Sequence, residues 1–226
     1  HRRLPETLVR AMHGAGVMRL VHVSALGAAP YAPSNYLRSK AAGEEALKAG
    51  GLALTILRPS VIFGAQDQLL NLFAHMQGWL PLLPLAAGNV HMQPVWVEDV
   101  AAAIVAVLAN PSWAGHTVEC TGPQTMTLSE IVRLAGRLAG HERPQVPLPG
   151  WLARVQAFTF ECLPGQPLMS RDNLDSLRVP SVASGRLPGL ADLGITAASV
   201  HAVAPTYLAP GQGLARLDTF RASHRD

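Results

Sequence analysis

Residues 17–24 of this 226-residue chain read VMRLVHVS, and residues 36–40 read YLRSK after a loop that contains glycine, proline and serine. The first stretch is a short run of mainly apolar and β-branched side chains, which predicts a strand that ends near Ser24. Ser34 or the asparagine after it is a suitable N-cap, which predicts a helix from about residue 36 to residue 48. The sequence therefore predicts a strand, a loop and a helix in succession.

The same alternation continues along the chain. Residues 52–57 (LALTIL) form an apolar run typical of a strand buried on both faces, and residues 116–121 predict another strand. We expect helices over residues 1–15, 36–48 and 67–78, after the acidic pair Glu98-Asp99, and from the capping box that begins at Thr127. This order of elements predicts an α/β fold with a parallel sheet.

Composition and charge exclude several classes of protein. Lys plus Arg is 18 and Asp plus Glu is 15, so the net charge is only +3, and aromatic residues are 5% of the chain. The arginines are scattered, so the sequence predicts no nucleic-acid groove. The two cysteines are far apart, and Cys120 lies about 13 Å along a strand from His116, so we expect neither a disulfide scaffold nor a metal site.

Two long stretches, residues 68–97 and 100–118, contain no Asp, Glu, Lys or Arg. Prolines interrupt the first, and the second has an apolar core of only about ten residues, too short for a membrane span. We therefore expect a soluble protein. An apolar patch over residues 79–87 is expected to lie near a membrane or a partner.

Tyr36 and Lys40 are four residues apart at the start of a predicted helix, so their side chains share one face. A nearby ammonium group stabilises a phenolate, and we expect Lys40 to lower the pKa of Tyr36 toward a range useful for acid–base chemistry. Tyr36 would exchange its proton with a hydroxyl oxygen of the substrate, and Ser24, at the end of the preceding strand, is placed to donate a hydrogen bond to that oxygen. The alternative is that Tyr36 is a half-buried surface ring beside a solvated lysine.

Ser24, Tyr36 and Lys40 resemble the Ser…Tyr-x-x-x-Lys set of the short-chain dehydrogenase/reductase superfamily. Two further motifs resemble its extended and atypical branches, namely LRPSVIFG at 57–64 and PVWVEDVA at 94–101. Three stretches, 36–45, 63–73 and 167–177, resemble the bacterial relatives of the nucleotide-binding accessory subunit (alpha subcomplex subunit 9) of respiratory complex I. The resemblance covers about residues 1–208.

The resemblance implies a Rossmann fold that holds NAD or NADP at the carboxyl ends of its strands. It implies that Tyr36 is the catalytic acid/base, that Lys40 anchors the ribose and tunes the phenol, and that Ser24 orients the substrate. Pro59 and Ser60 would line the nicotinamide side through their backbone. No metal is implied.

Two other groups of residues receive weaker roles. Asp99 is expected to be a helix cap rather than a catalytic group. Arg171, Asp172 and Asn173 lie where extended family members close over their substrate, although an ordinary solvated turn explains them as well. We expect His22 to be a packed strand residue.

The chain departs from the family pattern at its start. No G-x-x-G-x-x-G motif follows a predicted strand, and residue 1 is His, so we expect an N-terminally truncated chain. We expect residues 1–144 to form a partial NAD(P)-binding Rossmann-like domain and residues 145–226 to form a mostly helical, irregular appendage on the substrate side. Alone, such a fragment is expected to bind the cofactor weakly, and the choice between NAD and NADP is not readable from it.

Three functions follow from these observations. The first is an NAD(P)-dependent oxidoreductase or epimerase-like enzyme that acts on a small hydroxyl or keto compound. The second is a non-catalytic NAD(P)H-binding module that has a structural or assembly role near a respiratory quinone-reducing complex. The third is a redox-sensing regulator. The expected location is the cytoplasm, with peripheral association at the inner face of the membrane under the second function.

Overall fold

The computed structural model describes residues 3–162 and 169–210. Helices alternate with strands through the first two thirds of the chain, and the predicted α/β class is confirmed. The strands are β1 (Arg19–Val23), β2 (Ala53–Pro59), β3 (Ile62–Phe63), β4 (Leu83–Leu85), β5 (His91–Met92), β6 (Val95–Trp96), β7 (Thr117–Cys120), β8 (Met126–Thr127) and β9 (Gln145–Pro147). The helices are α1 (Arg3–Gly14), α2 (Asn35–Lys48), α3 (Leu70–Trp79), α4 (Val97–Ala109), η1 (Pro111–Trp113), α5 (Leu128–Leu138), α6 (Gly150–Glu161), α7 (Arg171–Ser176), η2 (Leu190–Leu193), α8 (Val200–Val203) and α9 (Pro205–Leu208).

The main sheet has the order β1-β2-β7, and both pairings are parallel. β2 is the central strand, and its residues from Leu54 to Leu57 are buried, as the apolar run predicts. The strand continues two residues further than expected. Pro59 pairs with Cys120 of β7, and the Pro59 carbonyl oxygen accepts a hydrogen bond from the Leu26 N–H.

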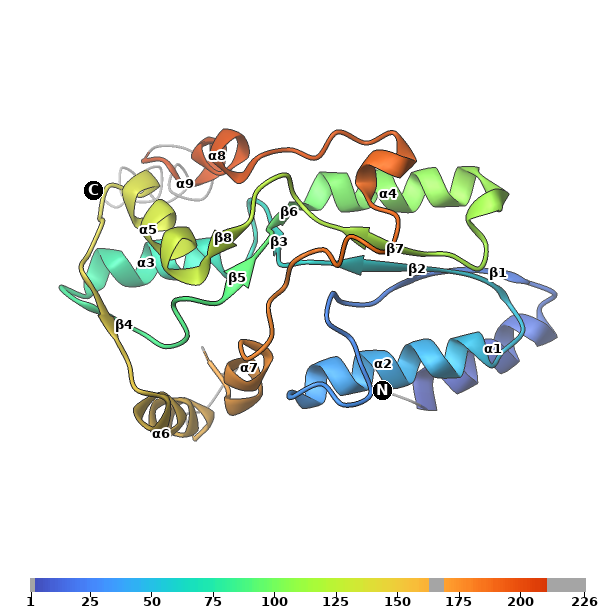
Figure 1. The fold of residues 1–226 in the computed structure, drawn as a ribbon, viewed down its shortest axis with the longest axis horizontal. Coiled ribbons are helices and arrows are strands. Elements are labelled where there is room, and N and C mark those ends of the chain that lie inside the picture. The colour runs from blue at the N-terminus through green and yellow to red at the C-terminus, as the bar shows by residue number, and fades with distance from the viewer. Residues whose placement is uncertain (1–2, 163–168, 211–226) are drawn as a thin grey trace, which may run out of the picture.

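Helices cover both faces of this sheet, with α1 and α2 on one side and α4 on the other (Figure 1). The predicted N-cap of α2 is confirmed, since Ser34 Oγ accepts a hydrogen bond from the Leu37 N–H at 3.2 Å. An ion pair holds α2 against β2. Arg58 donates from Nε and Nη2 to the Glu44 carboxylate at 2.9 and 2.6 Å, and the Glu44 side chain is almost completely buried.

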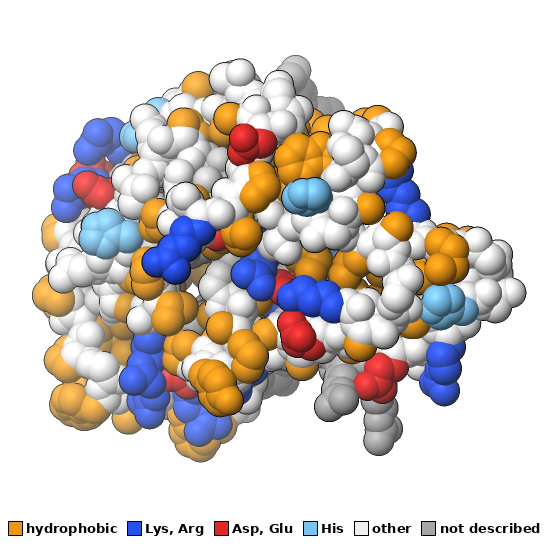
Figure 2. Space-filling view, turned by 45° about the vertical axis from the view of Figure 1, so that its right-hand side comes forward, with side chains coloured by type: hydrophobic (Ala, Val, Ile, Leu, Met, Phe, Trp, Pro, Cys, Tyr) orange, Lys and Arg blue, Asp and Glu red, His pale blue; other side chains and the backbone are white. Residues whose placement is uncertain are grey.

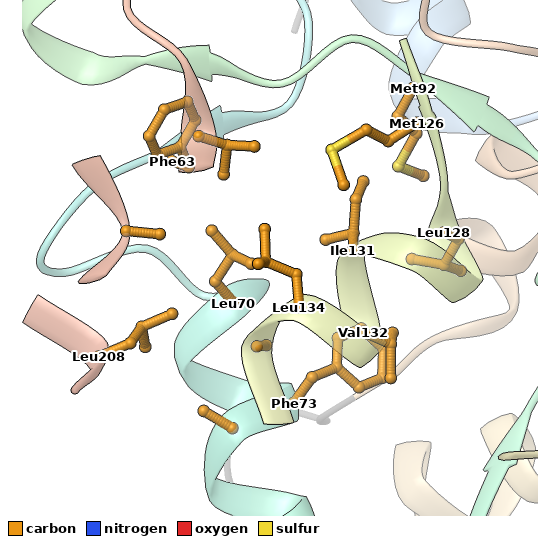
Figure 3. Close-up of a cluster of buried hydrophobic side chains, with 14 of the residues drawn as sticks. Phe63, Leu70, Phe73, Met92, Met126, Leu128, Ile131, Val132, Leu134 and Leu208 are labelled. Atoms are coloured by element: carbon orange, nitrogen blue, oxygen red, sulfur yellow. The ribbon is translucent and has the colours of Figure 1, made fainter. Parts of the chain in front are cut away.

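A second hydrophobic cluster lies between α3 and α5, beyond the carboxyl end of β2 (Figure 3). Leu70 and Phe73 of α3 face Ile131 and Leu134 of α5. The two helices also share the buried amide of Gln77, which donates from Nε2 to the carbonyl oxygens of Phe73 (3.1 Å) and Val132 (2.9 Å). The helix from Thr127 buries one face, as its apolar spacing predicts, since Ile131, Leu134 and Ala135 are buried whereas Glu130, Arg133 and Arg137 are exposed.

Three pairings between very short strands were not predicted, namely β3–β6, β4–β9 and β5–β8. Strands of two or three residues are too short to show the alternation on which sequence prediction depends. The segment from residue 145 therefore begins with a strand rather than with a helix. Within residues 79–87, β4 buries Leu83 and Leu85, whereas Trp79 and Leu82 are exposed. In the described ranges, no helix is both long enough and apolar enough to cross a membrane.

The C-terminal segment runs back over the sheet and ends on the α3–α5 cluster, where α9 buries Tyr207 and Leu208. The expectation that Asp99 caps α4 is wrong, because the helix begins after Trp96 and has no side-chain cap. The buried Asp99 carboxylate instead accepts a hydrogen bond from the Ala198 N–H at 2.8 Å, so it fixes the returning segment. Residues 163–168 and 211–226, part of the predicted appendage, lie outside the described residues.

The predicted capping box at the start of α5 is confirmed. Thr127 Oγ1 accepts from the Glu130 N–H, and the Glu130 carboxylate accepts from the Thr127 N–H and hydroxyl. We expect Thr127→Ala to lower the free energy of unfolding by about 1 kcal/mol at pH 7, measured by urea denaturation. A loss as small as that of Thr159→Ala, an exposed position on α6, would contradict this role.

The same box makes part of the stability depend on pH. Hydrogen bonds from Thr127 hold the pKa of Glu130 below its ordinary value of 4.5. A depressed carboxyl pKa stabilises the folded state above the unfolded pKa, and this contribution disappears as pH falls through the folded-state pKa. The difference in stability between wild type and Thr127→Ala is therefore expected to shrink below pH 4.5. An equal difference at pH 3 and pH 7 would contradict it.

Candidate functional site

The predicted site residues meet at one cavity of about 1230 Å³. Ser24 directly follows β1, and Ser60 directly follows β2. Because parallel strands end at the same edge of a sheet, these residues lie at the edge where doubly wound folds bind ligands. Tyr36 and Lys40 come from the first turns of α2, beside this edge. All five candidates, Pro59 included, line the cavity.

Tyr36 and Lys40 share one face of α2, as their spacing predicts. Lys40 Nζ lies 5.8 Å from the centre of the Tyr36 ring and donates to the Val23 carbonyl oxygen at 3.3 Å. This bond joins α2 to the end of β1. The Tyr36 side chain is about half exposed, with 47% of its surface accessible. A ligand in the cavity can therefore reach both groups.

The expectation that Lys40 lowers the pKa of Tyr36 is wrong, because the pKa is shifted in the opposite direction. Partial burial of the phenol raises the pKa of Tyr36 above its ordinary value of 10.0. The lysine does not reverse this effect, because its ammonium group lies over the ring and is hydrogen-bonded to a backbone carbonyl. The phenol is therefore protonated at neutral pH, which suits a proton donor.

Ser24 is buried, with 3% of its surface exposed, and it lines the cavity. Among the described residues, its hydroxyl has no hydrogen-bond partner. An unsatisfied buried hydroxyl costs about 1–3 kcal/mol, so such groups call for an explanation in a native structure. A ligand oxygen in the cavity would satisfy Ser24 Oγ.

Ser60 and Pro59 are more strongly engaged by the protein itself. Ser60 Oγ lies 2.8 Å from the Ser181 carbonyl oxygen and 3.0 Å from Ser181 Oγ, and its N–H donates to the Cys120 carbonyl oxygen. These bonds fix the turn after β2 against the C-terminal segment. That Pro59 and Ser60 contact a cofactor through their backbone stays a prediction.

Asp172 has a role that sequence reasoning missed. Its carboxylate accepts hydrogen bonds from the N–H groups of Asn35 (2.6 Å) and Tyr36 (2.9 Å), so it caps the helix that carries the tyrosine. The resemblance marked the 171–173 region only as a segment near the substrate, because no local pattern reveals a contact across 136 residues. Asn173 also lines the cavity, whereas Arg171 pairs with Glu161 at 2.8 Å.

We expect Asp172→Ala to lower the free energy of unfolding by about 1–2 kcal/mol, because it leaves two helix N–H groups without their acceptor. Urea denaturation measures the loss, and amide exchange at Asn35 and Tyr36 should accelerate. Asp175→Ala is the matched control on α7, since it removes a partly exposed ion pair with Arg154 that is worth at most about 1 kcal/mol. Equal effects of the two variants would contradict the capping role.

Other candidate groups lie apart from this chemistry. His22 does not line the cavity, and burial and the nearby Lys40 charge lower its pKa, in keeping with a packed neutral ring. Cys120 is fully buried, and burial raises the pKa of its thiol to about 12. Within residues 3–162 and 169–210, no group of three His, Cys, Asp or Glu side chains could hold a metal ion.

Comparison with known proteins shows what this chain is similar to. An NAD(P)H-binding family model matches residues 2–111. The chain is 34% identical to the mouse NADH dehydrogenase [ubiquinone] 1 alpha subcomplex subunit 9 over 198 residues, which cover 85% of this chain and 51% of that protein. It is 33% identical to a ceramide reductase of Caulobacter vibrioides over 140 residues, which cover 62% of this chain and 44% of that protein.

Solved structures show the same fold at low sequence identity. An Escherichia coli NADPH-dependent quinone oxidoreductase complexed with NADPH superposes with a TM-score of 0.67 at 17% identity, covering 88% of this chain and 69% of that one. A nucleoside-diphosphate-sugar epimerase from Staphylococcus aureus gives a TM-score of 0.66 at 16% identity, covering 87% and 67%.

These findings confirm the Rossmann-like fold and the prediction of a cofactor of the NAD or NADP type. The chain spans about half the length of the curated complex I relatives that it matches. The sequence motifs, the family-model match and the relatives all indicate a protein that binds NAD or NADP. The family-model match and the curated relatives support the expected relationship to the atypical and extended branches of the short-chain dehydrogenase/reductase superfamily, and the chain is similar in sequence to alpha subcomplex subunit 9 of complex I.

Proposed function

We propose that this protein is an NAD(P)-dependent oxidoreductase that acts on a carbonyl or hydroxyl compound. One observation carries the proposal: Ser24, Tyr36 and Lys40 line a single cavity at the carboxyl edge of the sheet, and among the residues that the structure describes the buried Ser24 hydroxyl has no hydrogen-bond partner. A buried hydroxyl beside a protonated phenol fits a carbonyl oxygen that accepts two hydrogen bonds.

The residues present fit the nicotinamide and ribose end of a cofactor. Lys40, within 5.8 Å of the Tyr36 ring, would bind the ribose hydroxyls, while Pro59 and Ser60 would line the nicotinamide side. The sequence contains no Gly-rich turn for the pyrophosphate. We therefore assign this chain only the half of the cofactor site nearest the reacting carbon. We propose that this half lies in residues 1–144, and that residues 145–226 close over the substrate side.

When bound, the cofactor supplies a hydride for reduction or accepts one for oxidation. Ser24 Oγ would donate a hydrogen bond to the substrate oxygen and hold it beside Tyr36. Tyr36 Oη would then transfer its proton to that oxygen as negative charge develops there. Lys40 would stabilise the resulting phenolate, and the Asp172 cap would keep the first turn of α2 in place.

The test uses the protein as its gene encodes it. NADH and NADPH are added separately, and the shift in melting temperature is measured. Oxidation of the bound cofactor is then followed at 340 nm with a panel of quinones and ketones. The proposal expects at least one cofactor to raise the melting temperature and at least one carbonyl compound to be reduced. Absence of any cofactor effect would overturn it.

A second candidate is a non-catalytic NAD(P)H-binding module with peripheral association to a respiratory complex. The observation that favours it is the 34% identity to a complex I subunit across 85% of this chain. The same experiment separates the two functions. Stabilisation by NADPH without turnover of any carbonyl compound would support the binding module and exclude the enzyme.

A further inference from the structure

The cavity lining has a large apolar part besides the candidate site residues. Leu72 and Phe73 of α3 belong to this part of the lining, as do Met169 and Leu177 of the C-terminal segment. The volume of about 1230 Å³ exceeds the upper range of ordinary ligand pockets, so the site has room for a substrate of considerable length beside a nicotinamide.

The wall of this apolar part is rigid. Phe73, Met92 and Leu128 line the cavity and also belong to the cluster between α3 and α5 that Figure 3 shows. All three are buried, with at most 5% of their surface exposed. Side chains packed into a core keep a fixed position, so the apolar surface is part of the folded structure.

Charged groups are scarce in the cavity. Among its described lining residues, Lys40 is the one cation and Asp172 the one anion. Both are engaged, since Lys40 donates to the Val23 carbonyl oxygen and Asp172 caps α2. Over the face shown in Figure 2, Lys and Arg side chains are dispersed among acidic and apolar ones. Several cations bind a diphosphate group best, and the described cavity lining offers one.

We propose that the substrate is a carbonyl compound attached to a long hydrocarbon chain, with the carbonyl at Ser24 and Tyr36 and the chain between α3 and residues 169–179. This inference rests on the proposed function and names its substrate class. In a ketone, the carbonyl π bond would break, a C–H bond would form with the nicotinamide hydride, and an O–H bond would form with the Tyr36 proton. In a quinone, the same hydride and proton would convert the two carbonyl groups into the two hydroxyl groups of the hydroquinone. The carbonyl compound is reduced, the nicotinamide is oxidised, and solvent reprotonates Tyr36.

Two chemical sources share this description, an alkyl quinone and a long-chain ketone. The probes are therefore decylubiquinone and 2-tridecanone, each compared with its short-chain counterpart, and UDP-glucose represents the sugar nucleotides. Binding is measured by titration calorimetry on the protein as encoded by its gene, with and without NADPH. Each buried methylene is expected to tighten binding about fourfold until the apolar part is filled. The quinone and ketone arms show which head group the Ser24 end accepts.

Two variants test where the hydrocarbon chain of the substrate binds. Leu72→Glu and Met169→Glu each place a carboxylate in the apolar lining, and each is expected to weaken binding of the long-chain probe at least tenfold while short-chain binding changes little. Leu108→Glu, on the exposed side of α4 and outside the cavity lining, is the control and should leave both unchanged. Melting curves are recorded to check that all three variants fold. If only one of Leu72→Glu and Met169→Glu folds, that variant alone is enough for the test.

The outcomes separate this inference from the proposed function. Cofactor binding and reduction of short ketones, without any gain from chain length, would overturn the inference and leave the function intact. UDP-glucose binding tighter than either long-chain probe would also overturn it. Chain-length-dependent binding without any cofactor effect would support the apolar site and overturn the oxidoreductase.

Discussion

Tyr36→Phe is expected to lower carbonyl reduction by about 10²–10⁴-fold while leaving the fold and the cofactor-induced rise in melting temperature unchanged. The substitution removes only the phenolic oxygen, and the ring keeps its position beside Lys40. Rates are measured as NADPH oxidation under saturating carbonyl compound. Tyr31→Phe is the matched control, because Tyr31 is 96% exposed and lies outside the cavity lining.

The pH dependence of the two reaction directions adds a sharper criterion. Burial raises the pKa of Tyr36 above 10.0, so the phenol carries its proton throughout the neutral range. Reduction needs the protonated phenol and should lose rate only above pH 10. Oxidation of the alcohol needs the phenolate and should accelerate as pH rises toward that value. A Tyr36→Phe enzyme that retains more than a tenth of the wild-type rate would show that another group transfers the proton.

Gly136→Ala is expected to lower the free energy of unfolding by about 2–4 kcal/mol. Helix propensity alone would predict the opposite, because it favours alanine over glycine by about 1 kcal/mol. A methyl group at this position of α5 would lie 2.2 Å from Gln77 Oε1 and 2.7 Å from its Nε2. The amide must then move and lose its bonds to Phe73 and Val132, and each buried polar group left unpaired costs about 1–3 kcal/mol.

Gly43→Ala in α2 supplies the matched control. A methyl group there would lie 3.7 Å from Pro5 Cγ, which is ordinary van der Waals contact. This variant is expected to be more stable than wild type by about 0.5–1 kcal/mol, because alanine restricts the unfolded chain. Urea denaturation measures both. A stabilising effect of both substitutions would mean that the Gln77 amide can move without loss.

Most of the fold could be predicted because its signals are local. The buried strand β2 appears as six consecutive apolar or β-branched residues, and the capping box of α5 lies within four residues. The candidate site was equally accessible, since Ser24, Tyr36 and Lys40 are close in sequence and a strand, a loop and a helix bring them to one edge of the sheet.

What could not be predicted depends on contacts between distant residues. Asp172 reaches Tyr36 across 136 residues, and Ser181 reaches Ser60 across 121. The direction of the Tyr36 pKa shift was also wrong, because it depends on where Lys40 Nζ lies and on how much of the ring is buried. Spacing along a helix specifies a shared face but neither of these quantities.

The Asp172 cap has a consequence for how the protein is made. Ribosomes add roughly 5–20 residues per second, so about 7–27 s pass between synthesis of Tyr36 and synthesis of its capping carboxylate. During this interval Ser34 is already in place to cap α2, but the N–H groups of Asn35 and Tyr36 lack their carboxylate acceptor. A polypeptide that ended before Asp172 would therefore carry Tyr36 on a helix that lacks one of its two caps.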